Sequence, residues 1–247
     1  MYPLTHIYFA RKVLGNLDDA TTLGSIFPDM VILCGIPWEE SHRLGLKLWP
    51  HFKDAPFPLS RFARGVITHG IEPPGLDYFS DEQYETFEKG YCFEKARPLV
   101  DQVIEALSIK PEDGWWKAHN FVEMGIELYI FDRNPELLSQ MRQSFKNQSL
   151  IELLVAHLSP LLVSRTKHLE ACFSIFERFV MEEEIDAELL AVRYERQIYH
   201  RHNIDSVDTD YCRELIIKGR QIIEDEIEDF FEDVKKKMEP LWTQLKQ

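Results

Sequence analysis

Hydrophobic residues recur at helical spacing along most of the chain, which predicts an all-helical fold. Apolar positions three and four residues apart dominate, and no convincing run alternates between polar and apolar residues. The first predicted helix begins at Thr5, a good N-cap residue, and ends near Gly15. From Ser80 onward helices follow one another, and we expect them over residues 81–89, 93–107, 114–131, 135–145, 149–158, 166–181, 186–200 and 208–238.

The N-terminal third is predicted to be rich in loops. A zone from Leu23 to Ser60 holds prolines and a glycine where a helix would need other residues. Ser60 then caps a second helix, whose inward stripe ends at His69, and the Pro73–Gly75 segment breaks the chain again.

The length and the absence of linkers, repeats or low-complexity tracts favour one all-helical domain over residues 1–247. Residues 1–131 hold the candidate chemistry, and residues 132–247 are interpreted as a helical scaffold. The last predicted helix has acidic residues near its start and lysines near its end, which complements the helix dipole. It is interpreted as a solvated face, with a homodimer contact as an alternative.

Charge limits the partners of the protein. The 28 basic and 42 acidic residues give a net charge of −14, which disfavours binding to duplex DNA or to an anionic membrane. No segment approaches the ~18 apolar residues of a membrane span. The four cysteines lie far apart and form no CxxC unit, and we expect them to be reduced, buried thiols. The first residues do not resemble a secretory signal, so we expect a cytoplasmic protein.

Four histidines lie among apolar residues, namely His6, His51, His69 and His119. Glu123 follows His119 by four residues, which places imidazole and carboxylate side by side on one helix face. A carboxylate in an apolar stripe is costly unless something neutralises it, and a divalent metal would do so. Each residue also has an ordinary explanation as a hydrogen-bonded core residue or a turn cap. Together they predict a metal site with the ligands His6, Asp29, His51, His69, His119 and Glu123.

The order of these motifs resembles the zinc-dependent phospholipase C family and its relatives, the single-strand-specific nucleases. Thr-His near the start, Pro-Asp, the His51–Asp54 segment, a helix ending in His, and the His119–Glu123 segment cover roughly residues 1–130. The resemblance implies an all-α bundle of the zinc-dependent phospholipase C type, with these six ligands around one or two ions, zinc first. The family pattern has an aspartate and a histidine where this chain has Pro73 and Phe79.

The resemblance implies hydrolysis of a phosphate ester, either a phospholipid or another phosphodiester or phosphomonoester. Two metals can clamp a phosphoryl group and activate a water. Asp29, Asp54 or Glu72 is expected to serve as ligand or general base, and Glu72 or Asp77 is an alternative for the missing aspartate. Asp54 and Asp77 are also candidates for orienting the ligand imidazoles.

The alternative hypothesis is a helical protein that has lost catalysis and keeps a metal for structure or for partner binding. Pro73, in place of the expected aspartate, favours it. Other catalytic patterns are missing, because the chain has no GxSxG elbow, P-loop, GxGxxG fingerprint, HExxH helix or His-Asp pair.

Overall fold

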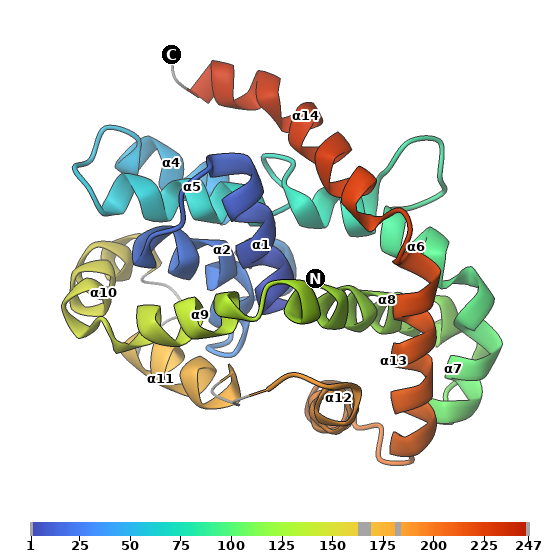
Figure 1. Cartoon of the computed structure of the whole chain (residues 1–247). Helices are drawn as coiled ribbons and strands as arrows, with labels where there is room; N and C mark the ends of the chain where they lie inside the picture. The colour runs from blue at the N-terminus through green and yellow to red at the C-terminus, as the bar shows by residue number, and fades with distance from the viewer. Residues whose placement is uncertain (1, 163–168, 181–183, 246–247) are drawn as a thin grey trace. The chain divides into compact units, whose positions relative to one another are not determined.

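The computed structural model describes residues 2–162, 169–180 and 184–245, and these residues form helices and no strand. The all-α prediction is therefore confirmed for the described part of the chain (Figure 1). No helix among these residues is long and apolar enough to cross a membrane. The chain divides into two compact units, and each unit is made of three separate segments of the sequence.

Unit 2 comprises residues 3–78, 135–183 and 232–247. Its helices are α1 (Pro3–Leu14), α2 (Asp19–Ile32), α3 (Trp38–Ser41), α4 (Leu44–Phe52), α5 (Leu59–His69), α9 (Glu136–Lys146), α10 (Gln148–Leu162), α11 (Leu169–Val180) and the C-terminal part of α14 (Ile227–Leu245).

The loop-rich zone predicted from Leu23 to Ser60 is wrong, because α2, α3 and α4 occupy most of it. Pro28 lies inside α2 and Pro50 inside α4. Proline removes one helical hydrogen bond each time, but burial of the surrounding apolar side chains outweighs this loss. Almost every residue from Ala20 to Val31 is buried, so packing keeps this segment helical in spite of Pro28.

The start of α2 is held by side chains from two other helices. Asp18 caps it by accepting a hydrogen bond from the Thr21 amide at 2.8 Å, and Arg61 of α5 binds the same carboxylate at 2.8 Å. Asp19 accepts hydrogen bonds from Ser144 of α9 and from Asn147 directly after it, at 3.0 and 2.8 Å. These bonds fix where α2 begins relative to α5 and α9.

Glycines let α2 and α5 approach closely. A Cβ atom at Gly24 would collide with the Phe62 carbonyl, and one at Gly65 would lie 2.8 Å from the Ser25 amide nitrogen. Because neither residue has a side chain, the two backbones meet without a layer between them. The first half of α2 therefore packs directly against α5, and His69, the last residue of α5, hydrogen-bonds to the Ser25 carbonyl of α2.

Unit 1 comprises residues 1–2, 79–134 and 184–231. Its helices are α6 (Tyr91–Ala96), η2 (Arg97–Leu99), α7 (Val100–Leu107), α8 (Pro111–Arg133), α12 (Ala187–His202), α13 (Thr209–Ile223) and the first turn of α14; η1 (Tyr78–Glu82) begins at the boundary between the units. Gly125 of α8 and Gly219 of α13 again allow two helices to touch through their backbones (Figure 1).

Two of the predicted helices differ from those in the structure. The helix expected over residues 81–89 is largely absent, because only η1 is helical there. The long helix expected over 208–238 is interrupted between Ile223 and Ile227, which separates α13 from α14. Phe230 follows the break and stacks on Tyr91 with ring centroids 4.2 Å apart. Aromatic packing of this kind redirects the chain in a way that helix periodicity does not reveal.

Two of the four cysteines differ from the prediction. Cys34 and Cys172 form a disulfide bond between the segment after α2 and helix α11, so these two are not reduced thiols. Cys92 and Cys212 are buried and form no disulfide bond, as expected.

Candidate metal centre

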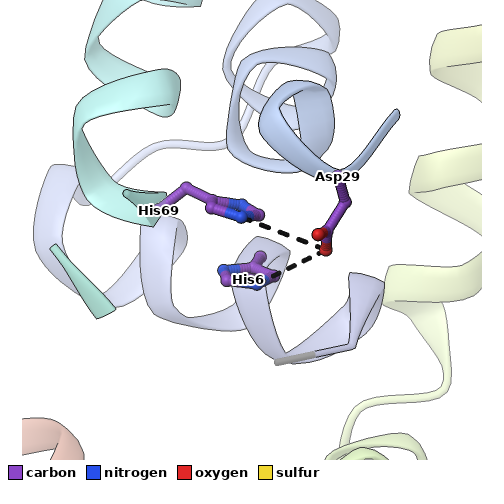
Figure 2. Close-up of side chains that lie close together, drawn as sticks. All are labelled: His6, Asp29 and His69. Carbon is purple, nitrogen blue, oxygen red and sulfur yellow. Dashed lines mark ion pairs between the residues drawn. The ribbon is translucent and has the colours of Figure 1, made fainter. Parts of the chain in front are cut away.

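Three imidazoles and two carboxylates of unit 2 gather at one point and are here called the donor cluster: His6, Asp29, His42, His69 and Asp77. His6 comes from α1, Asp29 from the last turn of α2 and His69 from the last residue of α5. Figure 2 shows the imidazoles of His6 and His69 facing the Asp29 carboxylate. Subsets of these residues could hold a metal ion, because their donor atoms lie within 4.8 Å of one another.

The segment after α5 brings Asp77 into the donor cluster. The Gly75 amide donates to the Gly70 carbonyl at 2.9 Å, which folds the segment back on the end of α5. The Ile71 amide donates to the His42 carbonyl at 2.8 Å, so the same segment also holds the residue that follows α3. A Cβ atom at Gly70 would collide with the His42 carbonyl. The loop after α5 thus carries Asp77 to His69 and also holds the backbone of His42 beside it.

The carboxylate of Asp77 contacts all three imidazoles. Its Oδ2 atom lies 2.9 Å from His42 Nε2 and 3.2 Å from His69 Nε2, whereas its Oδ1 atom lies 3.4 Å from His6 Nε2. The Nε2 atoms of His42 and His69 are 3.3 Å apart. Two donors bound to one tetrahedral zinc at ~2.0–2.1 Å are about 3.3–3.4 Å apart, so these spacings match a shared ion.

Asp29 lies slightly farther from the imidazoles. Its Oδ1 atom is 3.6 Å from His42 Nε2, and its Oδ2 atom is 3.8 Å from His6 Nε2 and 4.0 Å from His69 Nε2. The Asp29 side chain is 27% exposed, while those of the other four members are at most 1% exposed. Solvent therefore reaches the donor cluster at Asp29.

Backbone carbonyls fix the orientation of two imidazoles. His69 Nδ1 donates to the Ser25 carbonyl of α2 at 2.6 Å, and His42 Nδ1 donates to the Trp38 carbonyl at 3.0 Å. A carbonyl oxygen only accepts, so Nδ1 carries the proton in both rings. In the neutral tautomer Nε2 then offers a lone pair to the centre of the donor cluster, as in histidines that ligate metals.

His6 is the least satisfied member. It is 1% exposed, and neither of its ring nitrogens has a hydrogen-bond partner. Its ring stacks on His69 with centroids 3.5 Å apart. Buried polar atoms are nearly always hydrogen-bonded or bound to an ion, so this imidazole is missing a partner.

The electrostatics keep His6 neutral and Asp77 charged. Burial, followed by the charge on His69, holds the pKa of His6 well below its ordinary value. Burial alone would raise the pKa of Asp77, but the surrounding positive charge and the hydrogen bond from His42 hold it well below its ordinary value. Burial lowers the pKa of His69, but the Asp77 carboxylate outweighs it and raises that pKa. A divalent cation bound by the ionised carboxylates would displace the proton from His69, because metals bind the neutral imidazole.

The other residues predicted for the site in unit 2 lie outside the donor cluster. His51, in the last turn of α4, and Asp54 are exposed. Glu72 is 51% exposed and lies 3.6 Å from Arg43. His42 was missed by sequence reasoning because it follows the single-turn helix α3 and belongs to no periodic stripe. Asp77 was considered only as an alternative.

His119 and Glu123 lie on α8 in unit 1, where both are buried. His119 stacks on Phe93 at 4.1 Å, and its Nε2 atom accepts a hydrogen bond from the Asn120 amide at 3.0 Å. Burial lowers the pKa of His119 to about 4. Glu123 belongs to a second group that could hold a metal ion, together with Asp81 and Cys92, and His119 is not a member of that group.

All members of the donor cluster come from residues 6–77. A comparison of the chain with protein-family models, with curated proteins and with solved structures found no match.

Proposed function

We propose that the donor cluster binds divalent metal ions, with a preference for zinc, and that the protein hydrolyses phosphate esters. The observation that carries the metal is His6, a buried imidazole without a hydrogen bond that faces two carboxylates. Without a cation, both ring nitrogens of His6 would stay buried without a hydrogen bond, which is costly. A divalent ion supplies the missing partner.

The carboxylates support a pair of ions. Asp77 presents Oδ2 to His42 and Oδ1 to His6, and Asp29 presents Oδ1 to His42 and Oδ2 to His6. Carboxylates that direct their two oxygens to different nitrogen ligands are suited to bridging two metals. One ion would be held on the His42 and His69 side, and the other on the His6 side.

Phosphate-ester hydrolysis follows from this chemistry. Bound divalent ions stabilise negative charge on a phosphoryl group and lower the pKa of a bound water towards neutrality. The partly exposed Asp29 marks the side from which an ester reaches the donor cluster and is positioned to accept a proton there. His42 and His69 are held by backbone carbonyls, so they keep their orientation while the substrate binds.

A catalytically inactive metal protein is the second candidate. It is favoured by the burial of four donors, since His6, His42, His69 and Asp77 are at most 1% exposed. Structural metal sites are closed by protein ligands, whereas catalytic sites keep an open position. In this case the ion would stabilise unit 2 and would not turn over an ester.

Elemental analysis of the full chain, purified without a metal-affinity tag, tests metal binding. We expect one or two zinc equivalents in the natural protein and at most half of that in the His42→Asn variant. His51→Asn is the matched control, because His51 is exposed and lies outside the donor cluster. Equal metal content in all three proteins would contradict the proposed site.

Turnover separates the two candidates. Bis(p-nitrophenyl) phosphate and p-nitrophenylphosphorylcholine report hydrolysis of a diester, and p-nitrophenyl phosphate that of a monoester. We expect zinc-dependent release of nitrophenol from at least one of them, with loss of activity in Asp29→Asn. Full metal content without any turnover would instead support the structural candidate.

A further inference from the structure

A small cavity lies among four helices of unit 2, on a different set of residues from the donor cluster. It measures about 220 Å³ and is lined by residues of α1, α4, α5 and the end of α14: Val13, Leu14, Trp49, Arg64, Trp242 and Leu245. At ~30 Å³ per water-sized group, this volume holds roughly seven groups. The cavity is therefore large enough for a small organic molecule.

Two nitrogen donors of the residues that line the cavity lack an acceptor. Arg64 Nε and Trp242 Nε1 are both buried, and neither has a hydrogen-bond partner. Within the described part of the chain, no carboxylate forms an ion pair with Arg64. An arginine is always protonated, and a buried donor without an acceptor destabilises the folded chain, the more so when it belongs to a charged group.

An anion in the cavity would satisfy both donors. A carboxylate has two oxygens, one for the guanidinium and one for the indole N–H. Its single negative charge balances the single positive charge of Arg64, whereas a dianionic phosphate monoester would leave one charge uncompensated beside the apolar wall. The chain's net charge of −14 also disfavours a dianion.

The rest of the wall requires an apolar body on the same molecule. Val13, Leu14, Trp49 and Leu245 offer aliphatic and aromatic surface. Apolar ligand surface that is buried against these side chains favours binding. We propose that this cavity binds a small amphiphilic carboxylate, of the size of a medium-chain fatty acid, with the carboxylate on Arg64 and Trp242.

Fluorescence and calorimetric titration of the full chain with octanoate test the proposal. Trp49 and Trp242 line the cavity, so binding changes tryptophan emission. We expect saturable binding of one octanoate per chain, with octanol binding at least tenfold more weakly because it lacks the charge. Octyl phosphate at pH 8 provides the dianionic comparison and is also expected to bind more weakly. No saturation below 10 mM octanoate, or equal binding of octanol, would overturn the proposal.

Three variants locate the binding site. Arg64→Met is expected to weaken octanoate binding at least tenfold, and Trp242→Phe several-fold, because it keeps an aromatic ring and loses the N–H donor. Arg43→Met is the matched control, since Arg43 is exposed and does not line the cavity. Should Arg64→Met fail to fold, Trp242→Phe decides, because unchanged affinity in that variant places octanoate elsewhere and refutes the assignment.

Discussion

The Nε2 atoms of His42 and His69 lie 3.3 Å apart, and both face the Asp77 carboxylate. Both rings donate from Nδ1 to backbone carbonyls, so in the neutral state two lone pairs point into the same buried space. This arrangement is unfavourable without a shared proton or cation. For this reason we expect bound metal to stabilise the folded protein.

Removal of metal is expected to destabilise the protein. A chelator would leave the imidazoles and carboxylates of the donor cluster without their cation, whereas zinc at a hundred times its Kd stabilises the folded state by about 2.7 kcal/mol. Thermal unfolding with dipicolinate and then with added zinc measures the difference. The His42→Asn variant serves as control, and an equal response in it would contradict the assignment.

The contact between α2 and α5 is expected to control both stability and metal affinity. Gly65→Ala would place a methyl group against the Ser25 backbone and push the two helices apart, at a cost of about 1–3 kcal/mol. Since Asp29 and His69 lie on these helices, zinc affinity should fall as well. Urea unfolding and zinc titration measure the two effects. Ser60→Ala, on the same helix, should change neither by a comparable amount.

Because His119 is buried, we expect the free energy of unfolding to fall in acid. Burial lowers its pKa to about 4, below the ordinary 6.5, so the unfolded chain binds a proton there before the folded chain does. Stability contributed by the neutral ring is present above pH 6.5 and is lost as the pH falls towards 4. Between pH 7.5 and pH 5 the loss is about 2 kcal/mol.

Urea unfolding of the natural protein and of His119→Gln at both pH values measures this loss. The variant has no imidazole at position 119, so the difference in stability between the two proteins should shrink by a similar amount at pH 5. A difference that does not change with pH would mean that His119 is not held neutral in the folded state.

The disulfide between Cys34 and Cys172 is expected to stabilise the fold. It closes a loop across a sequence separation of 138 residues. Restriction of the unfolded chain by such a loop contributes up to about 5 kcal/mol in the chain-entropy model. Reduction, or the double replacement of both cysteines by serine, should lower the urea midpoint. Thiol titration of the denatured, unreduced chain should find two thiols, and four would contradict the bond.

The sequence predicted the helices that have a clear apolar stripe and failed where proline and glycine are buried. α5 lies close to its predicted range because its apolar stripe is regular, and α8 and α12 also lie close to theirs. In α2, Gly24 and Pro28 suggested a loop, but Gly24 is there to let α5 approach closely. Local propensity was overridden by tertiary packing, which a single sequence does not display.

The candidate site was predictable only in part. His6 and His69 lie on the apolar stripes of predicted helices, and Asp29 belongs to the two-residue motif Pro28-Asp29. His42 has no comparable signal, since it reaches its neighbours through a backbone contact between the end of α3 and the loop after α5. The role of Asp77 depends in the same way on how that loop folds back.

The limited exposure of Asp29 has a kinetic consequence for the proposed metal. Asp29 is 27% exposed, whereas its four neighbours are almost completely covered, so an incoming hydrated ion would meet this carboxylate first and shed its waters there. The ion would enter and leave the donor cluster past the Asp29 side chain. Metal exchange should therefore be slower than at an open surface site.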